Sequence, residues 1–141
     1  MNKLNTLFLY GITLTMLILP NFSIAEIAVV VGSNSAITTT DLNELKRVYS
    51  GKSKSLGGVT VSPINQKEGA ITDTFNREVL NKSSTQVKAY WSKLIFTGKG
   101  TPPKEVSGDA EVIAAVSSEA TAVGYIDSSS VTDSVKVILS F

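Results

Sequence analysis

The sequence contains no cysteine and no histidine. Without cysteine, the chain can form no disulfide, no thiolate nucleophile and no cysteine-ligated metal site. Without histidine, it lacks the commonest general base and the commonest transition-metal ligand. No carboxylates have a metal-site spacing, and no serine or threonine has a base to activate it. We therefore expect no catalytic residue, no metal and no other cofactor, and the sequence predicts a protein that is not an enzyme.

A surplus of positive charge is also missing. The 141 residues include 13 Lys and Arg and 12 Asp and Glu, a net charge of +1. Removing residues 1–25 takes one basic residue, Lys3, and no acidic residue, which leaves a net charge of zero. Nucleic-acid-binding domains normally carry a basic excess. The composition therefore predicts no nucleic-acid partner.

Residues 1–25 have the pattern of a secretory signal peptide. Lys3 gives a positive start, and Leu7–Leu19 is an apolar run shorter than the roughly 20 residues of a membrane span. Small residues at 23 and 25 match the positions that signal peptidase reads. We expect a cut between Ala25 and Glu26, and an uncleaved anchor is the alternative. Residues 26–141 then have the length of one compact domain.

Strand and helix patterns alternate through this domain, which predicts an α/β fold. The continuous apolar run 26–32 is typical of a strand covered on both faces. Asp41 and Glu44 have the spacing of a capping box, and Gly124 marks a close approach within a strand. Residues 52–58 look like a flexible basic connection. Strands are expected over 26–32, 59–64, 122–126 and 135–139, and helices over 42–50, 71–80, 85–97 and 110–118.

The most informative stretch is Val59–Leu80, which reads as a strand, a polar turn over 66–69 and a helix. Such a loop leaves free backbone N–H groups at the positive end of a helix dipole, where anions bind. The alternative is an ordinary β–loop–α unit with no ligand. If an anion binds here, its partners are expected to be Lys67, Gly69, Ala70, Ile71 and Thr72.

Three other groups are weaker candidates. Ser33 and Asn34, followed by Ser35, come after the first strand, where α/β sheets often bind ligands, but they also suit a solvated loop. The pair Tyr90-Trp91 suits core packing better than an exposed aromatic platform. Four lysines in glycine-rich connections can form a basic rim or simply keep the loops soluble: Lys52, Lys54, Lys99 and Lys104.

Four segments, taken together and in order, resemble phosphate-type periplasmic substrate-binding proteins. They are EIAVVVGSNSAITTTDLNELKRVYSGK (26–52), RVYSGKSKSLGGVTVSPINQKEGAITDTFNREVL (47–80), KAYWSKLIFTGKGTPPKEV (88–106) and AVGYID (122–127). The resemblance implies a type 2 periplasmic-binding-protein fold with a mixed β-sheet flanked by helices. It also implies phosphate or a similar oxyanion as ligand, an ABC transporter permease as partner, and a periplasmic location. Full secretion is the alternative location.

The chain departs from that family in two respects. Its length suits one lobe of a two-lobed protein, and what it contains resembles the second lobe. The family's Ser-Gly-Thr at the helix start is replaced by Gly69-Ala70-Ile71-Thr72, and no arginine stands in the loop. These departures motivate an alternative function. The chain would then be a single-lobe interaction protein of the cell envelope that has lost its ligand and forms a homodimer or binds another protein.

Overall fold

The computed structural model describes residues 18–20 and 25–141. Apart from residues 18–20 and 25, the expected signal peptide lies outside the described residues, so it stays a prediction. Within the described ranges, no helix is both long and apolar enough to cross a bilayer.

A five-stranded mixed sheet forms the centre of the fold, in the order β5-β4-β6-β1-β7. β4 is parallel to β5 and to β6, whereas β1 is antiparallel to both of its neighbours, β6 and β7. β1 therefore runs opposite to the other four strands. This is the mixed α/β sheet that the sequence predicts. The strands are β1 (Ile27–Gly32), β4 (Ser62–Gln66), β5 (Lys104–Val106), β6 (Ala122–Asp127) and β7 (Val135–Ser140).

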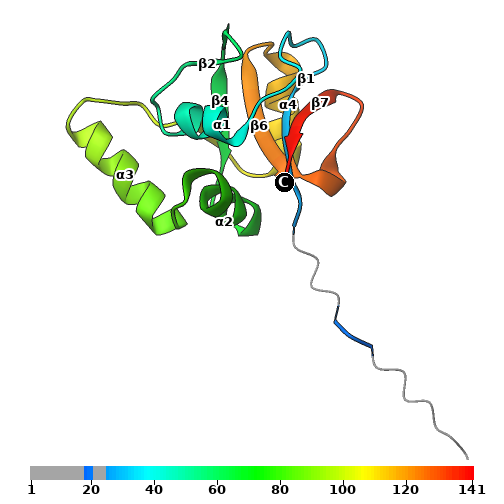
Figure 1. The fold of residues 1–141 in the computed structure, drawn as a ribbon, viewed down its shortest axis with the longest axis horizontal. Helices are drawn as coiled ribbons and strands as arrows, with labels where there is room; N and C mark the ends of the chain where they lie inside the picture. Colours follow the sequence, from blue (N-terminus) through cyan, green and yellow to red (C-terminus); the bar gives the residue numbers. More distant parts are fainter. Residues whose placement is uncertain (1–17, 21–24) are drawn as a thin grey trace, which may run out of the picture.

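Helices cover both faces of the sheet (Figure 1). One face is covered by α1 (Leu42–Tyr49), α2 (Ala70–Phe75) and the π-helix η1 (Asn76–Leu80), and α3 (Ser84–Phe96) packs beside η1 at the side of the sheet. The other face is covered by α4 (Asp109–Ser118). A short 3-10 turn, η2 (Ser128–Ser130), follows β6.

β1 is buried along its whole length. Ile27, Val29 and Val31 point to the core under α1 and α2, whereas Ala28 and Val30 point to the core under α4. Successive strand side chains point to opposite faces, so a strand covered on both faces must be apolar at every position. The prediction drawn from the continuous apolar run is confirmed.

The core beneath α1 and α2 is built around three aromatic rings. Phe75 stacks on Tyr125 at a centroid distance of 3.8 Å, and Tyr49 meets Phe75 edge-on at 4.7 Å. The Tyr49 hydroxyl donates to the carbonyls of Ile64 (2.9 Å) and Val123 (3.2 Å). Because buried hydroxyls need partners, these bonds fix α1 against β4 and β6.

The core beneath α4 depends on close approach instead. A Cβ on Gly124 would lie 2.5 Å from Val112 Cγ1, and one on Gly32 would lie 2.4 Å from the Val116 carbonyl oxygen. Both distances are too short for a side chain, so α4 packs directly onto the backbone of β6 and β1. The close approach predicted at Gly124 is confirmed.

Residues 52–58 are not a flexible connection, and that prediction is wrong. β2 (Ser55–Leu56) and β3 (Val59–Thr60) form a hairpin whose turn is Gly57-Gly58, with φ of +55° and +81°. Positive φ at both positions is the requirement of a tight primed turn, and two glycines meet it. The strand expected over 59–64 is accordingly two strands, β3 and β4.

Helix ends follow the predictions in part. The Asp41 carboxylate caps α1 by accepting from the Glu44 amide at 2.9 Å, but the Glu44 carboxylate accepts from the Thr40 hydroxyl and the Gly57 amide instead of completing the box. Ser83 does form a complete capping box with Gln86. The helix expected over 71–80 begins at Ala70 and continues as the π-helix η1.

Candidate functional site

The expected anion site lies where β4 gives way to α2. The Lys67 amide still bonds to the sheet, donating to the Val106 carbonyl at 2.9 Å. Gly69 is the extended N-cap of α2 and supplies no side-chain cap. The first helical bond runs from the Asp73 amide to the Gly69 carbonyl at 2.9 Å. The N–H groups at 70–72 therefore have no acceptor within the helix and can donate to a ligand.

Thr72 does not present its hydroxyl at this edge. The side chain is 4% exposed, and its hydroxyl donates to the Lys67 carbonyl at 2.8 Å. Ile71 is partly buried against the core. Of the five residues expected here, Lys67, Gly69 and Ala70 are exposed. The structure brings all five together, but Thr72 holds the loop in place instead of facing solvent.

Acidic side chains surround this helix start. Glu68 pairs with the Lys88 ammonium, and Asp73 accepts a hydrogen bond from the Ser84 hydroxyl. Negative charge near this edge also acts on Tyr125, which is buried beneath it. Burial is the main cause that raises the pKa of Tyr125 to about 12, hydrogen bonds within the network oppose the rise, and the charges of Glu105 and Asp73 add to it. Negative charge at this edge weakens the attraction of any anion to Lys67.

A polar network that the sequence analysis missed lies beneath the edge. The side-chain amide of Gln66 donates through Nε2 to Asp109 Oδ1 at 2.7 Å and to the Tyr125 carbonyl at 2.8 Å. Asp109 Oδ2 accepts from the Asp127 amide and the Ser130 hydroxyl. Gln66 was expected in a turn, which is wrong because Gln66 ends β4; Asp109 is the first residue of α4, one residue before the start expected for that helix. The available signal was the spacing of Ile64 and Gln66, which places the glutamine on the same buried side of the strand as the isoleucine.

Ser33 and Asn34 lie at the opposite edge of the sheet. Val31 is paired with Val123, the residue that also pairs with Pro63 at the start of β4. Because β1 runs antiparallel to β6, its carboxyl end lies beside the amino end of β4. Ser35 is buried, and its hydroxyl accepts from the Ile37 amide at 3.2 Å. The structure therefore does not bring this loop to Lys67.

The proposed basic rim is divided between two hollows. Lys54, Lys99 and Lys104 line a groove of ≈ 790 Å³ at the amino end of β4 and β5, whereas Lys52 lines a separate small pocket. Trp91 is 8% exposed, and the Tyr90 hydroxyl donates to the Ser50 carbonyl at 2.6 Å. The prediction of core packing for this pair is confirmed for Trp91, and Tyr90 is partly buried. Within residues 18–20 and 25–141, no three acidic side chains are grouped to hold a metal.

No protein-family model matches the chain, and no curated protein matches it in sequence. Solved structures do match its fold. A protein of Clostridium perfringens assigned as a phosphate ABC transporter substrate-binding protein, with bound phosphate, has a TM-score of 0.63 and 20% identity over 82% of this chain and 45% of its own. An ABC-type phosphate transport receptor of Vibrio cholerae has a TM-score of 0.59 and 19% identity over 83% and 47%, respectively.

A third structure, from Planctomyces limnophilus and assigned as phosphate-binding, has a TM-score of 0.55 and 16% identity over 82% of this chain and 42% of its own. The chain thus spans less than half the length of each of these neighbours. At these identities the likeness establishes the fold alone. The chain has a periplasmic-binding-protein-like fold, with a mixed sheet flanked by helices.

Proposed function

We propose that this chain is an exported solute-binding-type protein that binds phosphate or a similar oxyanion, or assists its uptake by an ABC transporter. The carrying observation is the set of free N–H groups at 70–72, close in sequence to the exposed Lys67, at the carboxyl end of a parallel strand. Two solved neighbours of the same fold are described as proteins of phosphate ABC transport. On this proposal the protein acts in the periplasm, with the transporter's permease as its partner.

The chemistry of such a site is non-covalent. Backbone N–H groups at the positive end of α2 donate to phosphate oxygens, and Lys67 adds a point charge without the two-pronged geometry of arginine. Glu68 and Asp73 oppose this attraction, and the Thr72 hydroxyl is already engaged. We therefore expect weak binding unless a second protein surface covers the site.

Calorimetric titration of the purified protein with phosphate, and with sulfate as a second oxyanion, tests this proposal. Lys67→Ala should abolish the heat of binding, whereas the exposed Lys99→Ala, with the same loss of charge, should leave it unchanged. A folded-state ligand also raises the melting temperature in proportion to its occupancy. No heat and no thermal shift at several millimolar phosphate would rule out direct capture.

The second candidate is a non-catalytic interaction protein of the cell envelope, acting as a homodimer or with another protein. It is favoured by one observation: Phe96, at the end of α3, is 93% exposed, and its neighbour Ile95 is 55% exposed. Exposed apolar pairs of this kind are typical of protein contacts. Sedimentation velocity tests it, since a dimer through this end of α3 should dissociate in Phe96→Ser, while a concentration-independent monomer contradicts a homodimer.

A further inference from the structure

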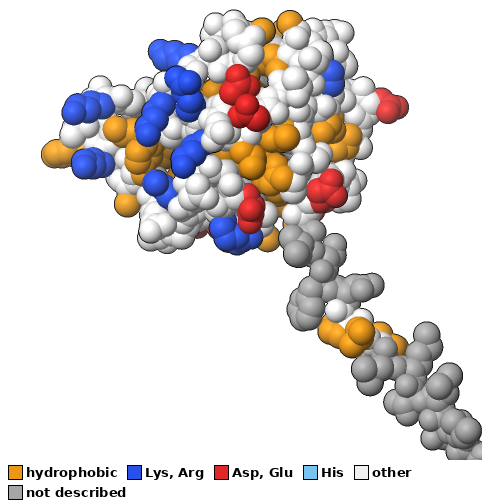
Figure 2. Space-filling view, in the orientation of Figure 1, with side chains coloured by type: hydrophobic (Ala, Val, Ile, Leu, Met, Phe, Trp, Pro, Cys, Tyr) orange, Lys and Arg blue, Asp and Glu red, His pale blue; other side chains and the backbone are white. Residues whose placement is uncertain are grey.

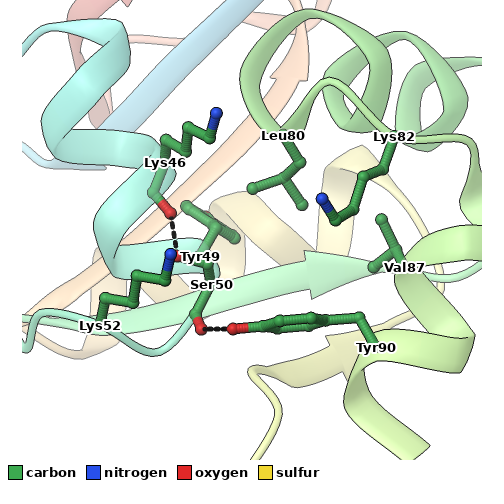
Figure 3. Close-up of a pocket in the computed structure, with 8 residues that line it drawn as sticks. All are labelled: Lys46, Tyr49, Ser50, Lys52, Leu80, Lys82, Val87 and Tyr90. Carbon is green, nitrogen blue, oxygen red and sulfur yellow. Dashed lines mark hydrogen bonds between the residues drawn. The ribbon is translucent and has the colours of Figure 1, made fainter.

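A small pocket with three lysines on its rim lies between α1, η1 and α3 (Figure 3). Lys46 and Lys52 come from α1 and the turn that follows it, and Lys82 extends toward them from the residues after η1. The volume of the pocket is ≈ 60 Å³. Since a water molecule needs about 10–15 Å³ of such space, a pocket of ≈ 60 Å³ admits a group of about four to six heavy atoms.

The wall and floor of the pocket are mainly apolar and are held in place. Leu80, Val87, Tyr49 and Tyr90 line it. The Tyr90 hydroxyl donates to the Ser50 carbonyl at 2.6 Å, and the Tyr49 hydroxyl is bonded to two strand carbonyls. Because its hydroxyl is already engaged, the Tyr90 ring presents carbon to the pocket (Figure 3). The pocket is thus formed before any ligand arrives, which lowers the entropic cost of binding.

The three ammonium groups have no carboxylate partner. The ion pairs among the described residues are Arg77 with Glu78 and Lys88 with Glu68. Lys46 lies in the last turn of α1, where a cation also interacts favourably with the helix dipole. That interaction explains one lysine on the rim. It does not explain three around one apolar pocket.

The pocket also lies in the basic half of an uneven charge distribution. Residues 46–104 hold 11 of the 13 Lys and Arg but 3 of the 12 Asp and Glu. Figure 2 shows these cations gathered over the side of the molecule that carries α1 and α3, with acidic side chains toward the centre and the opposite side. Such a field attracts anions to this side although the domain is neutral overall.

We infer that this pocket binds a small organic phosphate monoester. The apolar part of the ligand enters between Leu80, Val87 and Tyr90, and the phosphate lies on the rim among the three ammonium groups. Lysine suits phosphate as a point charge. The site is separate from the start of α2, because Gly69 and Leu80 are eleven residues apart along a helical segment, roughly 16 Å at 1.5 Å per residue.

The test is amide-resolved NMR titration of the protein with three ligands: phenyl phosphate, inorganic phosphate and benzyl alcohol. Phenyl phosphate has both the charge and the apolar part, and each of the others has only one. We expect phenyl phosphate to shift amides in 46–52 and 80–90 and to bind about tenfold more tightly than either partial ligand. Equal binding of inorganic phosphate, or shifts confined to residues 67–72, would overturn the assignment.

A lipid headgroup offers the same chemistry, and a second arm distinguishes it from a soluble ester. Cosedimentation with vesicles of phosphatidic acid, against phosphatidylcholine alone, measures binding to the lipid form. Either the soluble ester or phosphatidic acid must bind in a manner that depends on the three lysines. If neither ligand binds, the proposed site is refuted.

Matched variants separate binding by the three lysines of the pocket from the general attraction of an anion to positive charge. The triple variant K46A/K52A/K82A should weaken binding of the ester at least about tenfold, whereas K93A/K99A/K104A loses the same charge and should change it less than about twofold. Lys67→Ala should leave it unchanged, so failure of the phosphate site at α2 and failure of this pocket give different results. If the triple variant melts early, the single variant Lys82→Ala replaces it. Equal loss in both triple variants overturns the proposal.

Discussion

The two ends of the helical segment 70–80 would attract an anion by different means, backbone N–H groups at one end and lysine side chains at the other. At the start of α2 there are free N–H groups and the positive end of a helix dipole, but Glu68 and Asp73 stand beside them. Beyond η1, at the negative end of this segment, three lysines surround an apolar pocket. The side-chain charges therefore run against the backbone dipole. The difference teaches that backbone donors and side-chain cations, the two features that attract an anion, gather at opposite ends of one helical segment and have to be tested separately in this protein.

Replacing Phe75, the last residue of α2 before η1, is expected to have the largest effect on stability and on anion binding. It is fully buried and stacks on Tyr125, so Phe75→Ala should cost about 3–5 kcal/mol of unfolding free energy. Both anion responses should be lost together, since the same side chain anchors α2 and η1. Denaturant unfolding followed by circular dichroism measures the cost.

Phe96 provides the matched control for that measurement. Because it is 93% exposed, Phe96→Ala should change stability by less than about 0.5 kcal/mol. A comparable loss of unfolding free energy in the two variants would mean that the packing around α2 does not depend on the aromatic stack.

Tyr125→Phe affects only the N-terminal end of the segment. The hydroxyl donates to the Asn65 side chain and accepts from the Gln66 amide at 3.3 Å. Removing it leaves buried polar groups without a partner, at a cost of about 1–3 kcal/mol. The phosphate response at Lys67 should weaken, while the pocket beyond η1 should respond as before. Loss of both responses would show that the two ends are coupled.

Alkaline pH is expected to lower the stability of the folded state. Burial raises the pKa of Tyr125 to about 12 from an ordinary value of 10.0, and burial also raises the pKa of Tyr49. The folded state therefore keeps these protons when the unfolded state has lost them, so stability is complete below pH 10 and falls as the pH rises from 10 toward 12. Urea unfolding between pH 8 and 11.5 measures the slope, which should be shallower in Tyr125→Phe. Identical slopes would contradict a shifted Tyr125.

Glu68→Gln gives the smallest expected effect. It removes an exposed carboxylate next to Lys67 and releases Lys88 from its ion pair. Phosphate binding at the start of α2 should tighten by about twofold, in keeping with the modest strength of exposed charge pairs. Glu119→Gln, an exposed carboxylate at the other edge of the sheet, is the control. Calorimetric titration that finds no difference between the two variants would show that local charge does not limit this site.

The sequence predicted the features that depend on local pattern. The continuous apolar run at 27–31 identified a strand buried on both faces, and Gly124 identified the close approach of α4. The alternation of strands and helices gave the fold class. Each of these follows from the burial or conformational preference of neighbouring residues, which a single chain displays directly.

Features that depend on strand direction and on distant partners were not predictable in this way. Ser33 and Asn34 were expected at a ligand-binding edge, but the direction of β1 relative to β4 is decided by pairing with β6. Asp109 is a helix residue locally, yet it accepts from Gln66, 43 residues away in sequence. The three-lysine pocket likewise joins residues from three separate elements, although the basic bias of residues 46–104 was visible in the sequence.

The direction and position of β1 also have a consequence for how the chain folds. β1 is the first strand in the sequence, but its two partners, β6 and β7, are the last two. During synthesis from the N-terminus, this wholly apolar strand has no pairing partner until residues beyond 122 have been made. Pairing over such a separation carries a large loop-closure cost and slows folding. The sheet is therefore expected to close around β1 only once β6 and β7 have been made, and until then the apolar side chains of β1 remain uncovered.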